Sequence, residues 1–235
     1  MRETLWPDVT IQPRPTGPDT MPYVRSYVFM RFAIGVLGVA LPFVLVFVEP
    51  ILFDGQPFPR GSLSAYYYSG MREVFVGVLW AIGMFLITYK LTERSWESRL
   101  STVAGAAVIV VAVFPTQRPG AGVDLTPLQN LLSESLVEGI HYVSAGAFIG
   151  SLAVISYLFG RDEARRSAGA GRPSQRATFH WTCAGIIIAA LALAAVAGIT
   201  SWPDKGLLIA EVAAVLAFAA SWLAKVELDL LFGRR

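Results

Sequence analysis

Two glutamates and a histidine are spaced so that they share one face of a predicted membrane helix. Glu134, Glu138 and His141 follow one another at i, i+4 and i+7, and Ser144 lies close to the same stripe. A histidine beside a carboxylate can act as a general base or as a pH sensor. The same side chains can instead form a clamp of ion pairs and hydrogen bonds between the second, fourth and sixth spans. The spacing leaves both interpretations open.

Further polar residues are expected at the same end of the molecule. The stretch 62–73 carries hydroxyl groups and three consecutive tyrosines, and it leads directly into an apolar segment. The tyrosines suit the aromatic belt at a membrane boundary, whereas charges that enter an apolar helix each need a partner. We therefore expect a polar pocket at the outer end of the protein. Its candidate residues are Ser64, Tyr67, Ser69, Arg72, Glu73, Glu138, His141, Ser144 and Glu211.

Metal and hydrolase chemistry can be weighed by counting residues. Glu138 and His141 have the Glu-x-x-His spacing of carboxylate di-iron bundles, but such sites need the motif on two helices. The other histidine, His180, has Ala177 and not a glutamate three residues before it, so the second motif that a di-iron site needs is absent. One zinc ion on Glu134, Glu138 and His141 is a minor alternative, and overall we predict no metal and no cofactor. No G-x-S-x-G elbow accompanies the serines near His141.

The composition indicates a multi-pass membrane protein. The chain has 235 residues, of which 54% are hydrophobic and only 15% are charged, whereas soluble domains carry roughly 25% charged residues. Apolar runs recur at about the 20-residue length that a bilayer requires. The sequence predicts an all-α bundle of six membrane helices within a single domain, 28–231. The expected spans are 32–53, 71–91, 100–114, 137–159, 177–199 and 206–226, with tails at 1–27 and 232–235.

The basic residues predict the orientation of these spans. With both termini in the cytosol, fifteen lysines and arginines fall inside and four outside, as the positive-inside rule requires. We expect integration into a bacterial inner (plasma) membrane. The inner charges, among them Glu97, Lys225 and Glu227, are expected at solvated helix ends. Small residues on the spans, such as Gly35, Gly83, Gly146 and Gly150, are expected to pack against neighbouring helices of the bundle, and dimerisation through these faces is the alternative.

Several motifs resemble those of a group of uncharacterised bacterial six-span membrane proteins, known as a domain of unknown function. They are the run 64–79, Phe114-Pro115-Thr116, 141–145, and Glu211 with the closing segment 221–225. In span count and size, the chain is also similar to the damage-regulated autophagy modulator type of membrane protein. The resemblance implies a fold and no activity.

The sequence favours a binding protein over an enzyme. We expect the outer pocket to bind a lipid headgroup or a membrane partner. The alternatives are a lipid-modifying hydrolase that uses His141, and an oligomeric channel or transporter. Membrane lipids are the expected partners, with a second copy or another membrane protein also possible. A formal charge of only +2 argues against nucleic acid.

Overall fold

The computed structural model describes residues 21–53, 58–88, 95–167, 174–200 and 205–226. This part of the chain forms helices and no strand. The elements are α1 Met21–Leu52, η2 Ser64–Tyr68, α2 Arg72–Thr88, α3 Trp96–Val113, α4 Pro127–Leu132, α5 Glu134–Arg166, α6 Gln175–Thr200 and α7 Gly206–Leu223. The helix α1 begins inside the predicted tail 1–27, and the predicted tail 232–235 lies outside the described residues.

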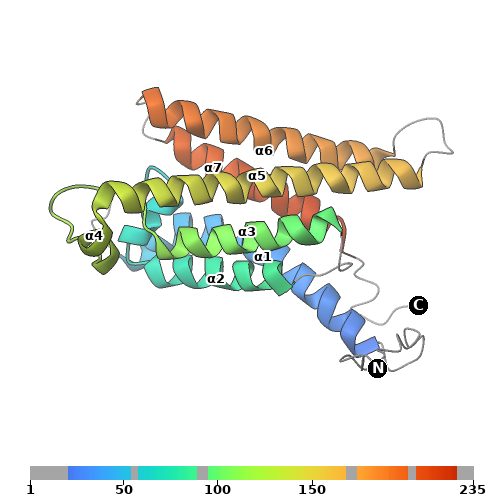
Figure 1. Cartoon of the computed structure of the whole chain (residues 1–235), viewed down its shortest axis with the longest axis horizontal. Coiled ribbons are helices and arrows are strands. Elements are labelled where there is room, and N and C mark those ends of the chain that lie inside the picture. The colour runs from blue at the N-terminus through green and yellow to red at the C-terminus, as the bar shows by residue number, and fades with distance from the viewer. Residues whose placement is uncertain (1–20, 54–57, 89–94, 168–173, 201–204, 227–235) are drawn as a thin grey trace, which may run out of the picture.

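The long helices form a bundle in which each packs against its neighbours in a closed ring. The order around the ring is α1, α2, α3, α5, α6 and α7, and α5 also contacts α7 across it (Figure 1). The short elements η2 and α4 lie at one end, where α1 and α3 finish and α2, α5 and α7 begin. We call this the η2 end, and the opposite end, where α5 finishes, the far end.

Five of the described helices are long and apolar enough to cross a membrane. They are α1, α3, α5, α6 and α7. The second predicted span, 71–91, corresponds to α2, whose described part has 17 residues and is not among the five. The third span, expected to be short at 100–114, begins earlier, at Trp96. Length and composition therefore indicate a helical membrane protein with several spans.

A close contact between α2 and α3 depends on two glycines. A Cβ atom placed on Gly105 of α3 would lie 2.6 Å from the carbonyl oxygen of Gly83 in α2. A Cβ on Gly83 would meet the Gly105 carbonyl oxygen at 2.9 Å. Backbone oxygens cannot move aside as the end of a side chain can, so only glycine permits this approach. Close backbone contact between small residues is a common way for membrane helices to associate.

Other small residues do not have the expected role. No neighbouring atom lies within 4 Å of a Cβ placed on Gly146 or Gly150. The prediction that this pair packs against another helix of the bundle is therefore wrong. Gly83 does pack as expected, and so does Gly35, whose Cβ would collide with Leu223. The spacing of glycines shows that one face of a helix lacks large side chains, but it does not show whether another helix packs on that face.

We predict that Gly105→Ala destabilises the bundle, because the added methyl group separates α2 from α3. Overpacking of this kind costs about 1–3 kcal/mol. Gly77→Ala, in α2, is the control, since no atom lies within 4 Å of a Cβ placed on Gly77. Thermal unfolding in detergent, followed by circular dichroism, measures both variants. Equal unfolding temperatures for the two would contradict the close α2–α3 contact.

Candidate functional site

A buried ion pair joins the end of α1 to the segment before η2. The Arg60 guanidinium donates to the Glu49 carboxylate from Nη2 at 2.7 Å and from Nε at 2.9 and 3.2 Å. Both residues are nearly inaccessible to solvent, at 6% and 1%. The guanidinium also lies 5.8 Å from the centre of the Tyr66 ring. Two-point contact between planar groups fixes orientation as well as distance, so the pair anchors this segment on α1.

The same segment is also joined to α7. The Glu211 carboxylate accepts hydrogen bonds from the backbone amide of Leu63 and from the Ser64 hydroxyl, the latter at 3.3 Å. The amide of Leu208, one of the unpaired donors in the first turn of α7, donates to the carbonyl oxygen of Gly61 at 2.9 Å. Glu211 therefore holds a turn of backbone and does not join Arg72 in an open pocket.

The three tyrosines differ in their surroundings. Tyr66 and Tyr67 are buried against helices of the bundle, so the aromatic-belt interpretation is wrong for both. The Tyr68 hydroxyl donates to the carbonyl oxygen of Thr116 at 2.9 Å and accepts from the side-chain amide of Gln129 at 3.0 Å. Burial raises the pKa of Tyr68 above its ordinary value, so this hydroxyl stays protonated and keeps its place.

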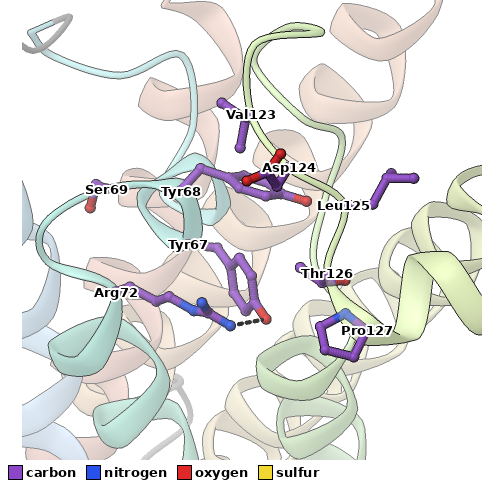
Figure 2. Close-up of a pocket in the computed structure, with 9 residues that line it drawn as sticks. All are labelled: Tyr67, Tyr68, Ser69, Arg72, Val123, Asp124, Leu125, Thr126 and Pro127. Atoms are coloured by element: carbon purple, nitrogen blue, oxygen red, sulfur yellow. Dashed lines mark hydrogen bonds between the residues drawn. The ribbon is translucent and has the colours of Figure 1, made fainter.

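A cleft of about 450 Å³ opens beside these tyrosines (Figure 2). One wall comes from η2 and the start of α2, and the other from the segment that leads into α4. The lining residues are Tyr67, Tyr68, Ser69, Arg72, Val123, Asp124, Leu125, Thr126 and Pro127. It is a mixed surface, with one cation, one carboxylate, several hydroxyl groups and some apolar side chains.

Arg72 is held at the cleft by contacts with Tyr67. Its Nη2 donates to the Tyr67 hydroxyl at 2.6 Å, and the guanidinium lies 4.3 Å from the centre of the same ring. The side chain nevertheless remains exposed. One aromatic ring thus fixes the guanidinium and leaves other donors of its fork available to a ligand.

The opposite wall is ordered by the start of α4. The Thr126 hydroxyl accepts from the amide of Gln129, and the Gln129 side chain accepts from the amide of Thr126, which forms a capping box. Arg118 donates to the Val123 carbonyl oxygen at 2.7 Å. It also pairs with Glu134, and the hydrogen bond to Glu134 raises the pKa of Arg118. These contacts fix the backbone on both sides of Asp124.

His141 is not part of the cleft. It is 2% exposed, and its Nδ1 lies 2.7 Å from the carbonyl oxygen of Phe114, the residue that ends α3. A carbonyl only accepts, so Nδ1 carries the proton and donates it. His141 thus satisfies a free carbonyl at a helix terminus, and this contact links α5 to the end of α3.

The structure divides the predicted pocket into separate groups. Tyr67, Ser69 and Arg72 line the cleft, and Ser64 meets Glu211 behind it. Glu138 interacts with Tyr142 on its own helix, while Ser144 is half-buried and Glu73 is exposed. Of Arg72, Glu73, Glu138, His141 and Glu211, which were expected to share one pocket, Arg72 lines this cleft and the other four do not. Glu49, Arg60 and Asp124 were missed because none of them shares a helical face with the predicted set.

The residues that the structure describes contain no group of three or more His, Cys, Asp and Glu side chains placed to hold a metal ion. No model of a protein family matches the chain, and no curated protein or solved structure matches it significantly.

We predict that Arg60→Gln destabilises the protein by about 3–5 kcal/mol, because it leaves the Glu49 carboxylate buried without its partner. Arg118→Gln is the control, since it breaks the more exposed pair with Glu134, and water and salt screen such exposed pairs so that they add little to stability. Thermal unfolding in detergent measures the difference. Similar losses from the two variants would contradict a structural role for the buried pair.

Proposed function

We propose that the protein binds the headgroup of a phospholipid in the cleft beside Arg72. The observation that carries this proposal is the exposed guanidinium of Arg72, held in place by Tyr67 in a cleft with both charged and hydroxyl-bearing walls. Arginine matches the geometry of phosphate oxygens, to which it can donate two parallel hydrogen bonds. A phosphate is therefore the group that this side chain recognises best.

Asp124 refines the class of headgroup. Its carboxylate lies on the opposite wall of the cleft from Arg72 (Figure 2). A headgroup with a phosphate and a primary amine would pair with both residues, the phosphate with Arg72 and the ammonium with Asp124. A purely anionic headgroup would meet like charge at Asp124, which disfavours it. Phosphatidylethanolamine has the required chemistry.

Leucines near the cleft support contact with lipid. Leu131 in α4 is 78% exposed, and Leu132 and Leu136 are also exposed. Apolar side chains on a short helix at a membrane boundary insert into the region between headgroups and acyl chains. Pro127 lines the cleft and is also the first residue of α4. Insertion of α4 at the membrane boundary would therefore hold the cleft at the depth of the headgroups.

The proposal includes the topology. The protein would have six spans, with α2 as the second, and both termini in the cytosol of a bacterial cell. The cleft would then face the outer leaflet. The distribution of basic residues supports this orientation. The length and apolar composition of α1, α3, α5, α6 and α7 support insertion into a membrane.

We predict that Arg72→Gln weakens retention of phosphatidylethanolamine about tenfold or more, since a hydrogen bond to a charged group contributes about 1.5–3 kcal/mol. The control is Arg99→Gln, which removes an equally exposed arginine that stacks on Trp96. Native mass spectrometry of the protein released from nanodiscs of defined composition measures the bound lipid.

Asp124→Asn gives the second arm of this experiment. It should reduce the preference for phosphatidylethanolamine over phosphatidylglycerol, because it removes the group that pairs with the amine. Lipid retention that is equal in wild type, Arg72→Gln and Arg99→Gln would overturn the proposal. A bound protein in place of lipid, lost in Arg72→Gln, would assign the cleft to a membrane partner instead.

We predict that a reporter inserted after Gly122 is located outside the cell, and that one inserted within 168–173 is in the cytosol. The first site lies at the η2 end and the second joins α5 to α6 at the far end. Paired alkaline phosphatase and fluorescent-protein insertions measure the two locations. Both reporters on the same side would contradict a single crossing by α5, and inverted locations would place the cleft in the inner leaflet.

A further inference from the structure

The far end of the bundle is held by buried charged side chains. Glu97 is 7% exposed. The Lys225 side chain is 13% exposed and pairs with the Glu163 carboxylate at 2.8 Å. The prediction that Glu97 and Lys225 lie at solvated helix ends is therefore wrong. The η2 end has a different character, because one residue of unusual backbone conformation joins α4 to α5 there.

Ser133 is that residue. It ends α4 and directly precedes Glu134, the first residue of α5. Its φ of 81° and ψ of 149° lie close to the extended region at positive φ that glycine occupies almost alone, because a Cβ atom is crowded there. It is the only residue other than glycine with a positive φ in the parts of the chain that the structure describes. Such strain persists only where surrounding contacts hold it.

The bend at Ser133 has a regular alternative. α4 ends one residue before Ser133 and α5 begins one residue after it, so helical dihedral angles at this residue alone would make 127–166 one helix. The leucines fit that helix, since Leu128, Leu132 and Leu136 recur at i, i+4 and i+8 across the bend and would share one face. In the structure α4 is instead turned away from the line of α5 (Figure 1). The chain thus has a bent and a straight arrangement that differ at one residue.

The helix α4 has little buried apolar surface to keep it in the bent arrangement. Of its six residues only Gln129 is buried, and Leu131 is 78% exposed. It packs mainly against α5. Ahead of α4, Arg118 joins Glu134 at the start of α5 to the Val123 carbonyl oxygen, which it contacts at 2.7 Å. Polar contacts rather than a buried apolar face therefore hold this wall of the cleft in place.

The connection before α4 is long enough for the straight arrangement. Phe114, at the end of α3, contacts His141 of α5. In a straight helix Pro127 would lie about 21 Å along the axis from His141, at a rise of about 1.5 Å per residue. Residues 115–126, which join α3 to α4, can span about 40 Å when extended. The chain therefore permits α4 to leave its place while α3 and α5 stay folded.

One hydrogen bond ties α4 to the other wall of the cleft. The side-chain amide of Gln129 donates to the Tyr68 hydroxyl at 3.0 Å, and that hydroxyl donates to the carbonyl oxygen of Thr116 at 2.9 Å. The side-chain oxygen of Gln129 separately accepts from the amide of Thr126 at 2.9 Å, as part of the capping box. Loss of the bond to Tyr68 leaves the capping box intact. α4 and its cap can therefore move as one unit.

We propose that α4 is a movable wall of the cleft, bent at Ser133 while Gln129 is bonded to Tyr68, and aligned with α5 once this bond breaks. Pro127 lines the cleft and begins α4, so straightening carries its wall away from Arg72 and opens the cleft (Figure 2). Strain at Ser133 favours the straight form, and the hydrogen bond of Gln129 favours the bent form. The role of this motion in lipid entry and release rests on the headgroup binding proposed above, whereas the motion itself does not.

Pulsed electron paramagnetic resonance on the full chain in nanodiscs measures the two arrangements. Spin labels are attached at Asn130→Cys in α4 and Tyr157→Cys in α5, two exposed positions, in a chain whose buried cysteine is removed by Cys183→Ala. In the straight form these positions lie about 40 Å apart along one helix axis. The bent form should give a second, shorter distance.

Two substitutions at Ser133 should shift these populations in opposite directions. Glycine accepts a positive φ and is a poor helix former, whereas alanine favours the helix. The ratio of straight to bent form should therefore be about fivefold or more higher in Ser133→Ala than in Ser133→Gly. Tyr68→Phe should also raise this ratio. Tyr67→Phe is its control, since it removes a hydroxyl of the same element that contacts Arg72 instead of α4. One unchanged distance in Ser133→Gly, Ser133→Ala and Tyr68→Phe would overturn the proposal.

Lipid exchange tests whether the moving wall controls the cleft. Native mass spectrometry follows the replacement of bound phosphatidylethanolamine by its deuterium-labelled form, added in vesicles. Exchange should be faster than wild type in Ser133→Ala and slower in Ser133→Gly. Equal exchange rates in these two variants would overturn the role of α4, even where their distances differ. Unchanged lipid retention in Arg72→Gln would remove the headgroup proposal alone, because the distances report the bend without any bound lipid.

Discussion

The η2 end of the structure depends on the buried pair between Glu49 and Arg60. A charge on either residue alone would be costly in the interior, so the two must come together as the chain folds. Their contact fixes residues 58–63 on the end of α1. The positions of Gly61 against α7 and of η2 beside α2 then follow, because only a few residues separate them from Arg60.

The helices could be predicted from the sequence to a large extent. Long apolar runs need internal backbone hydrogen bonds in a bilayer, so each run predicts a helix. The boundaries are less certain because polar residues extend the helices beyond the apolar core. α3 begins at Trp96 with a Ser95 cap, although its first turn contains Glu97 and Arg99 and does not look like part of a span.

The candidate site was harder to predict, since a helical stripe gives the face of a residue but not its neighbour. Glu138 and His141 do share a face, yet His141 meets the Phe114 carbonyl oxygen, which no side-chain pattern reveals. Arg72 and Tyr67, two of the candidate residues, do line the cleft. Asp124 lies in a connection without periodicity, so only the folded chain could place it opposite Arg72.

The two ends of the bundle hold their ion pairs in different surroundings. At the η2 end the Arg60 and Glu49 side chains are 6% and 1% exposed, whereas at the far end the Lys225 and Glu163 side chains are 13% and 14% exposed. Water and salt screen an exposed pair more than a buried one. The packing at the η2 end therefore depends more strongly on its two charges remaining matched, because removal of one partner would leave the other buried alone.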